Sequence, residues 1–353
     1  MGRVRLRCLS EVAPAVQSWI LKAPVLLVFA GLFTEAYCWI AVPNIQIGPS
    51  FKQPDAQLGM VQRTNFEGRR YTHEYDMHWS TGSQGFRGGS YSYATPDTGV
   101  RIASLGNSHT FGVGVQDDET YSALTERHLG DAEVINMAVI DGGTGILLRT
   151  WDEILSYQPD ALVIRYDAWN FQDPFKQYVA GDGALEPRSH QGQKASPLRL
   201  LESTPLQNSG AWGVMRLRYS ALSQGLRRAQ CRFTTLRTVH STQCIPRSDD
   251  AARERRAEQE RRLLEALARR VAESDMPVVF LRFLLTERQA ALFEATIPPL
   301  DNVRVLDFTD TVGDPAYHFP IDKHLNVGGH AFVADHLATE LQKLLPEADE
   351  DPP

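Results

Sequence analysis

The chain is poor in cysteine and has no excess of basic residues. Its 353 residues include four cysteines, spread along the sequence without a Cys-x-x-Cys pair, which excludes a cysteine framework for a metal. The formal net charge is −7, and the basic run at 253–270 is interleaved with glutamate, as on a solvated helix face. We therefore expect no metal site and no nucleic-acid partner.

Hydrophobic residues make up 42% of the chain and charged residues 22%, which is typical of a globular protein with a sizeable core. No internal repeat or low-complexity segment stands out, apart from an acidic tail at residues 347–353. The length allows one large domain or two ordinary ones.

Residues 23–42 form the longest apolar run, and Glu35 is the only charged residue in it. Twenty residues of helix span about 30 Å, which is the thickness of a bilayer core. Basic residues precede the run, namely Arg3, Arg5, Arg7 and Lys22. By the positive-inside rule this pattern predicts a single-pass membrane anchor at residues 23–42, with residues 1–22 cytoplasmic and the remainder exported. A cleaved signal peptide and a buried core helix remain as alternatives.

Cys231 and Cys244 lie 13 positions apart in a polar segment. If the domain is exported into an oxidising compartment, these two cysteines are candidates for a disulfide that closes a local loop, worth about 3 kcal/mol. The alternative is a pair of unrelated buried thiols.

The segment 43–100 is rich in glycine, serine, proline and aromatic residues and lacks helical periodicity. Because the aromatic residues of this segment need burial, we expect an extended lead-in that packs on the domain. These aromatic residues include Phe51, Phe66, Tyr71, Trp79 and Phe86.

Strand and helix patterns then alternate along residues 101–346, which predicts a parallel sheet with right-handed crossovers. The expected strands are 101–105, 133–137, 161–166, 277–283 and 303–308. The expected helices are 118–129, 146–157, 251–275, 287–295 and 327–345. Residues 171–250 hold no strong strand, and an insertion of this length is typical of a lid or a binding loop.

Polar residues follow several of these strands and should meet at the carboxyl edge of the sheet. They are Ser108, the Asp-Gly-Gly-Thr segment at 141–144, Asn170, and the segment 322–326 with Asp322 and His324. Serine, histidine and aspartate suit acyl transfer, as nucleophile, base and orienting group. Gly142, through its backbone N–H, and Asn170, through its amide, are candidates for an oxyanion hole. Each piece alone could also be an ordinary turn or helix cap.

Four motifs resemble the blocks of the SGNH (GDSL-like) hydrolase superfamily, in particular its membrane-anchored bacterial members. They are GNSHTFGVGV with Ser108 as nucleophile, NMAVIDGGT, AWN and DKHLNVGGH, and the upstream SQGFRG and DDET are also similar. The resemblance implies a flavodoxin-like three-layer α/β/α sandwich with ester hydrolysis or acyl transfer, and no cofactor or metal. The resemblance to membrane-anchored bacterial members implies that residues 23–42 lie in a bacterial inner membrane and that the domain is periplasmic.

The sequence departs from the family pattern in three places. Asn107 replaces the usual aspartate before the nucleophile, and Asp141 stands where the oxyanion glycine is expected, so Gly142 would substitute. The last block has Asp-x-His spacing, with Asp322 as the expected orienting residue for His324. His109 resembles a subset linked to O-acetylation of surface glycans, although a structural role is the simpler interpretation. His330 is expected to be a surface or packing residue.

The leading hypothesis is a serine esterase that acts on O-acyl, especially acetyl, groups of an envelope or exported glycan. Alternatives are hydrolysis of a small ester or lipid, O-acetyl transfer to a cell-surface polysaccharide, and a catalytically silent scaffold with partners in an envelope assembly.

Overall fold

The computed structural model describes residues 14–41, 52–55, 58–72, 74–94, 99–140, 142–171, 178–180, 185–187, 250–310 and 314–345. Asp141, Cys231, Cys244, most of the predicted insertion and the acidic tail lie outside the described residues. The predicted disulfide therefore remains a prediction.

Five parallel strands form the central sheet in the order β11-β10-β7-β5-β6. The strands are β5 (Val100–Leu105), β6 (Ala132–Asn136), β7 (Ala161–Asp167), β10 (Val278–Phe283) and β11 (Val303–Asp307). Numbered along the chain this order is 2-1-3-4-5, that of flavodoxin-like sheets. The predicted strands and the predicted parallel sheet are confirmed. The strand order reverses between β5 and β7, and such a switch point is where these sheets bind ligands.

The inner strands are buried on both faces, which explains their nearly continuous apolar sequences. All seven residues of β7 are buried. Successive residues point to opposite faces, so Val163 packs with one layer of helices and Ile164 with the other.

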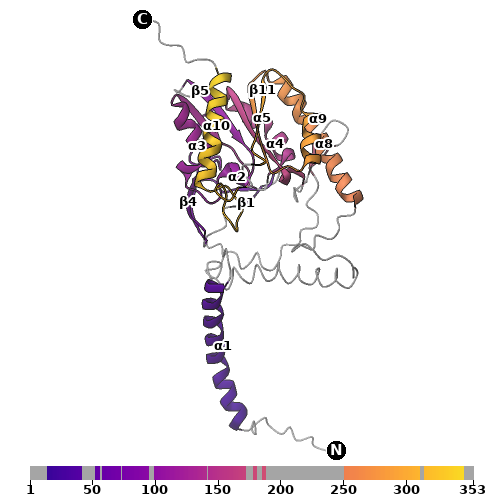
Figure 1. Ribbon diagram of the computed structural model, residues 1–353. Coiled ribbons are helices and arrows are strands. Elements are labelled where there is room, and N and C mark those ends of the chain that lie inside the picture. The colour runs from indigo at the N-terminus through magenta and orange to yellow at the C-terminus, as the bar shows by residue number, and fades with distance from the viewer. Residues whose placement is uncertain are drawn as a thin grey trace, which may run out of the picture.

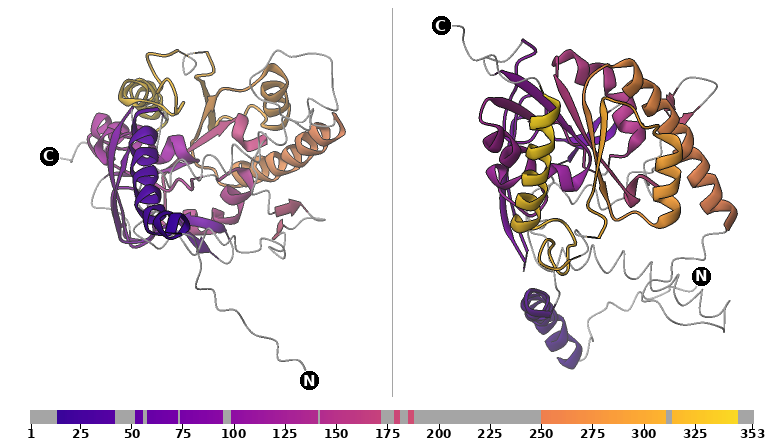
Figure 2. Two further views of the ribbon diagram at one scale, coloured as in Figure 1. Left: turned by 90° about the horizontal axis from the view of Figure 1, so that it is seen from below. Right: turned by 45° about the horizontal axis from the view of Figure 1, so that its top comes forward.

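Helices cover both faces of the sheet, giving three layers (Figure 1). On one face lie α3 (Tyr121–Leu129) and α10 (Val327–Leu344), whose apolar residues pack on the sheet. On the other lie α4 (Thr144–Arg149), α5 (Trp151–Ser156), α8 (Asp250–Glu273) and α9 (Glu287–Thr296). The two views of Figure 2 separate α10 from α8 and α9 in the same way.

The helix predicted at 146–157 is divided into α4 and α5 at Thr150. The Thr150 hydroxyl donates to the backbone oxygens of Ile146, at 3.1 Å, and Leu147, at 3.3 Å. A threonine hydroxyl bonded back to the preceding turn bends a helix, which accounts for the break.

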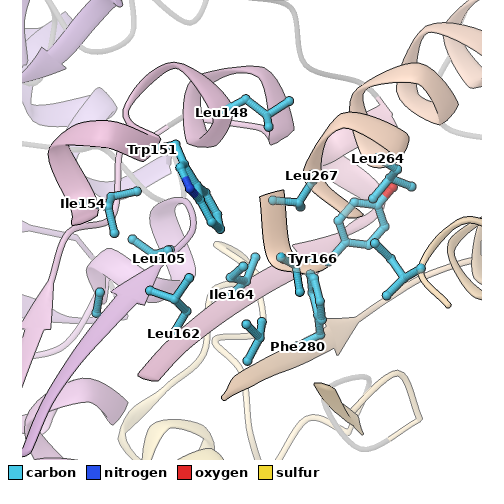
Figure 3. Close-up of a cluster of buried hydrophobic side chains, with 14 of the residues drawn as sticks. Leu105, Leu148, Trp151, Ile154, Leu162, Ile164, Tyr166, Leu264, Leu267 and Phe280 are labelled. Atoms are coloured by element: carbon cyan, nitrogen blue, oxygen red, sulfur yellow. The ribbon is translucent and has the colours of Figure 1, made fainter. Parts of the chain in front are cut away.

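The core on the α8 face is centred on Trp151, which is 1% exposed (Figure 3). Its ring points from α5 toward Leu105, Leu162 and Ile164 of the sheet, with Leu267 of α8 nearby. Burial of this many large side chains fixes α4, α5 and α8 on the sheet, and so fixes the polar residues that these helices carry.

The lead-in is more regular than predicted, because it contains two antiparallel hairpins. These are β1 (Lys52–Asp55) with β2 (Gly59–Gln62), and β3 (Phe66–Tyr71) with β4 (Asp76–Thr81). In β4 buried residues alternate with more exposed ones, and Met77 and Trp79 point into a third apolar cluster. Single bridges from Thr81 to Arg87 and from Arg87 to Asn136 connect the β3–β4 hairpin to the sheet. Of the aromatic residues that were expected to be buried, Trp79 is 3% exposed, whereas Tyr71 is 43% exposed. A further short pair, β8 (Tyr178–Ala180) and β9 (Leu185–Pro187), follows β7.

Helix α1 (Pro14–Ala41) contains most of the predicted anchor and extends away from the α/β domain (Figure 1). Its large apolar side chains between Val25 and Phe33 are exposed. Side chains 37–41 and residue 42 lie outside the described part. Among the described residues, no helix combines the length and apolarity required to cross a membrane.

Candidate active site

Ser108 lies directly after β5, at the first residue of the short helix α2 (Ser108–Phe111). The turn before it requires glycine, since a Cβ on Gly106 would lie 2.1 Å from Thr110 Oγ1 and 2.9 Å from Arg165 Cβ. Asn107 caps α2, because its Oδ1 accepts the backbone N–H of His109 at 3.3 Å. Close packing of this turn therefore presents the Ser108 hydroxyl at the switch point of the sheet.

Ser108, His324 and Asp322 form one hydrogen-bonded chain. Ser108 Oγ lies 2.8 Å from His324 Nε2, and His324 Nδ1 contacts Asp322 Oδ1. Because the carboxylate accepts the Nδ1 proton, Nε2 is left as the acceptor for the serine hydroxyl. The two residues that meet here, Ser108 and His324, are 216 positions apart. This is the arrangement of a nucleophile, a base and an orienting acid.

The Asp-x-His spacing is accommodated by the backbone of Lys323. Its φ is +70°, a left-handed conformation that is uncommon for residues other than glycine. Asp322 and His324 lie on either side of this residue with their side chains in contact. The shorter spacing is thus compatible with a triad.

The β3–β4 hairpin holds the loop that carries Asp322. Glu74, between the two strands, accepts the backbone N–H of Ile321 at 2.6 Å and that of Asp322 at 2.8 Å. Tyr75 donates its hydroxyl to Asp322 Oδ2 at 3.1 Å. Asp322 therefore has a hydrogen-bond partner on each carboxylate oxygen.

These contacts set the charge of Asp322. Burial by itself raises the pKa of the Asp322 carboxyl, but hydrogen bonding and attraction to His324, helped by Tyr75, more than offset it. The pKa of Asp322 lies below its ordinary value as a result. It is ionised whenever His324 needs a negative partner.

Arg87, in the SQGFRG segment, binds the backbone at the end of the nucleophile helix α2 and just beyond it. It is 2% exposed, and its guanidinium donates to the backbone oxygens of Phe111 and Gly112, each at 2.8 Å, and of Val115 at 2.7 Å. Its Nε pairs with Asp117 Oδ1 at 2.6 Å. One buried cation thus satisfies the carbonyls that follow α2, and the upstream motif and the DDET segment come together around it.

Asn107 belongs to a buried polar network and not to the triad. Its Oδ1 accepts from Arg165, its Nδ2 lies 3.3 Å from Asp167 Oδ2, and Arg165 pairs with Asp167. An amide can accept from the arginine and donate to the aspartate at once, whereas a carboxylate could only accept. This accounts for asparagine at a position where the family pattern has aspartate.

Asn170 lies in the short turn η2 (Ala168–Phe171) after β7 and is 5% exposed. Its Oδ1 accepts the backbone N–H of Asp167 at 3.1 Å, and its Nδ2 donates to Thr144 Oγ1 at 3.0 Å. Asn170 lines a pocket together with Gly106, Asn107 and Thr144. The predicted oxyanion donor and the nucleophile turn therefore border the same space.

Gly142 does not provide the donor that the sequence predicted. It lines the same pocket, but its backbone N–H donates to Val139 O at 2.7 Å, in a tight turn after β6. That proton is already used, so the predicted role of Gly142 has no support in the geometry. The backbone N–H of Ser108 lies at the start of α2, where an N–H has no acceptor within the helix.

The His109 side chain lies against His324 of the triad. Its ring centroid is 4.8 Å from that of His324 and 6.3 Å from that of Phe283. Burial, followed by the nearby positive charge of Arg165, holds the pKa of His109 well below its usual value. A neutral ring at this place packs against His324 without repelling its protonated form.

His330 is a packing residue, as one of the two expected possibilities had it, and it is fully buried. Its Nδ1 accepts the backbone N–H of Tyr121 at 3.0 Å, at the start of α3. Burial and the charge of Arg87 lower the pKa of His330 to about 3.

Among the described residues, no group of three or more histidine, cysteine or acidic side chains could hold a metal ion.

Tyr75, Glu74 and Arg87 were not predicted as parts of the site. Each acts through a contact between segments that are distant in sequence, 247 positions apart for Tyr75 and Asp322. The resemblance of SQGFRG and DDET to the family lead-in was the one available signal, and it did not specify a role.

Comparison with known proteins gives distant similarities to solved structures. No protein-family model matches the sequence, and no curated protein matches it significantly. A lipolytic protein of the G-D-S-L family from Desulfitobacterium hafniense shares 11% identity over 68% of this chain and 98% of its own, with a TM-score of 0.38.

Two other solved structures are similar to a comparable extent. A protein described as a possible lipase from Chitinophaga pinensis shares 10% identity over 69% of this chain and 98% of its own, with a TM-score of 0.34. A salicylyl-acyltransferase from a tetracycline biosynthetic pathway shares 17% identity over 72% of this chain and 58% of its own, with a TM-score of 0.31. Similarity at this level assigns no activity, so function has to be inferred from the site itself.

Proposed function

We propose that the protein is a serine esterase of the SGNH type that acts on O-acyl, especially acetyl, groups of an envelope or exported glycan. The observation that carries the proposal is the chain from Ser108 through His324 to Asp322 at the switch point of the sheet. Three of the four sequence motifs that resemble the SGNH blocks contain these three residues and Asn170.

In this mechanism Ser108 Oγ attacks the ester carbonyl while His324 Nε2 takes its proton. The imidazolium formed is stabilised by Asp322, whose ionised state is maintained by His324 and Tyr75. His324 then gives the proton to the sugar oxygen as its bond to the acyl carbon breaks, so the sugar leaves as an alcohol and the acyl group stays on Ser108. Water, activated by the same histidine, attacks the acyl-serine and releases the carboxylic acid.

The negative charge that develops on the carbonyl oxygen needs hydrogen-bond donors in fixed positions. We assign this task to the Asn170 amide and the Ser108 backbone N–H, since Gly142 is engaged with Val139. Removal of one such donor typically lowers kcat by about 10²–10³-fold. Asn170→Ala is thus expected to retain folding and to lose most of its turnover.

The membrane location is part of the same proposal. The exposed apolar residues of α1, and Arg3, Arg5 and Arg7 before it, support an anchor that holds the domain on the periplasmic face of the inner membrane. Protease added to spheroplasts should digest the α/β domain of the expressed protein. A domain protected until the membrane is lysed would contradict this orientation.

Hydrolysis of p-nitrophenyl acetate by the purified protein tests the activity. We expect turnover by the wild type, loss of about 10⁴-fold or more in Ser108→Ala and His324→Ala, and little change in His336→Ala, an exposed histidine on α10. A fluorophosphonate should label wild-type Ser108. Absence of both turnover and labelling would overturn the catalytic proposal and favour a silent scaffold.

Transfer differs from hydrolysis only in the acceptor, because both pass through the acyl-serine. With an acetyl ester as donor, added oligosaccharide should leave the product as free acetate if the protein is a hydrolase. Acetylated sugar as the main product would instead assign O-acetyl transfer to a polysaccharide.

A further inference from the structure

The Asn170 amide can stabilise an oxyanion only if its nitrogen, and not its oxygen, faces the reacting carbonyl. The two ends of an amide are nearly the same in size, so hydrogen-bond partners must decide between the two orientations. One partner is clear, because Oδ1 accepts the backbone N–H of Asp167 at 3.1 Å. The other partner is Thr144 Oγ1, 3.0 Å from Nδ2, and a hydroxyl can either donate or accept.

Glu260 decides what the Thr144 hydroxyl does. Thr144 Oγ1 lies 2.5 Å from Glu260 Oε1, which accepts its only proton. With that proton committed, Thr144 can only accept from Asn170, so the atom facing it must be the amide nitrogen. One N–H of Asn170 is held in this way, and Asn170 lines the same pocket as Gly106 and Asn107.

Glu260 is placed for this contact by the packing of α8 on the sheet. It is 0% exposed, and Thr144 is 2% exposed. Tyr166 reaches from β7 toward α8 and donates its hydroxyl to the same Glu260 oxygen at 3.2 Å (Figure 3). A buried carboxyl group is costly unless it is hydrogen-bonded, and here one oxygen accepts from two hydroxyls.

We propose that Glu260 and Thr144 are positioning residues that, together with the Asp167 backbone N–H, fix the orientation of the Asn170 amide, so that an N–H group faces the oxyanion. This rests on the proposed function, in which Asn170 is an oxyanion donor. In this series of hydrogen bonds Asn170 donates to Thr144 and Thr144 donates to Glu260, so each hydrogen bond has one direction.

The experiment is steady-state hydrolysis of p-nitrophenyl acetate by full-length variants, with kcat and KM measured separately. Thr144→Val keeps the shape of the side chain but removes the acceptor for Asn170. We expect kcat to fall by about 10- to 100-fold with KM little changed, since the interaction acts on the transition state.

Glu260 is tested with a pair of variants. Glu260→Gln keeps an oxygen that can accept from Thr144, and we expect kcat within a few-fold of wild type. Glu260→Met has a similar length and no such acceptor, and its kcat should fall as in Thr144→Val. Once the hydroxyl is absent Glu260 has no route to Asn170, so the Thr144→Val, Glu260→Met double variant should be no slower than the slower single variant.

Tyr166→Phe is the matched control, because it removes the other hydroxyl on Glu260 Oε1 and leaves the path to Asn170 intact. It should lower Tm without lowering kcat. Thr144→Val with wild-type kcat would overturn the inference, as would an additive double variant or equal losses in Glu260→Gln and Glu260→Met. If the wild type neither turns over substrate nor reacts with the fluorophosphonate, the proposed function fails and the inference fails with it.

Discussion

His330 should make the stability of the protein depend on pH below neutrality. Its ring is fully buried, and its Nδ1 accepts the Tyr121 backbone N–H, so a proton on that nitrogen would remove the acceptor and place a charge in the core. Burial, assisted by the positive charge of Arg87, lowers the pKa of His330 to about 3 in the folded state, whereas an unfolded chain has the ordinary value of about 6.5.

The sign and size of the effect follow from these values. Between pH 6.5 and 3 the unfolded chain binds a proton at His330 and the folded chain does not, so acid favours unfolding. Above pH 6.5 the contribution of His330 to stability is fully present. At pH 5 the cost is about 1.4 kcal/mol per pH unit over 1.5 units, or about 2 kcal/mol, which is roughly a 30-fold change in the unfolding equilibrium.

His330→Asn removes the titrating ring, and His336→Asn on the same helix, where the histidine is exposed, is the control. Urea unfolding of the full-length protein at pH 7.5, 6 and 5 gives the free energy of unfolding for each variant. The difference between wild type and His330→Asn should shrink by about 2 kcal/mol from pH 7.5 to pH 5, with no such change for His336→Asn. An equal pH dependence in wild type and His330→Asn would refute the reasoning.

Three further predictions concern the support of the triad. Tyr75→Phe removes the hydrogen bond to Asp322 Oδ2, and kcat should fall about tenfold. Because the pKa of Asp322 rises without this donor, the acid limb of a pH–activity profile should also move to higher pH. An acid limb at the same pH as in the wild type would contradict the prediction. Arg87→Lys cannot satisfy three carbonyls and Asp117 together, and thermal melting should show a loss of about 3 kcal/mol or more, with weakened Ser108 labelling. Gly106→Ala has no room beside Thr110 and should abolish turnover, while Gly89→Ala, where a Cβ meets nothing within 4 Å, is its control for loss of glycine and should remain active.

The sequence by itself determined the sheet and the chemical types at its edge. The short runs of β5, β7 and β10 favour buried strands because of their length and their β-branched and aromatic residues, and helices between them favour parallel pairing. Ser108, Asn170 and His324 follow strands or precede a helix, so their convergence at one edge could be predicted from local pattern alone.

Tertiary structure decided which groups assist Ser108, Asn170 and His324. Local sequence does not show which donors and acceptors are already used by other hydrogen bonds. Gly142 had the right residue type and position, yet a turn of its own uses its N–H. Tyr75 and Glu74 belong to a hairpin that only packing brings to the Asp322 loop. Glu260 sits in a charged stretch that resembles a solvated helix face, and only the burial of α8 against the sheet turns it toward Thr144.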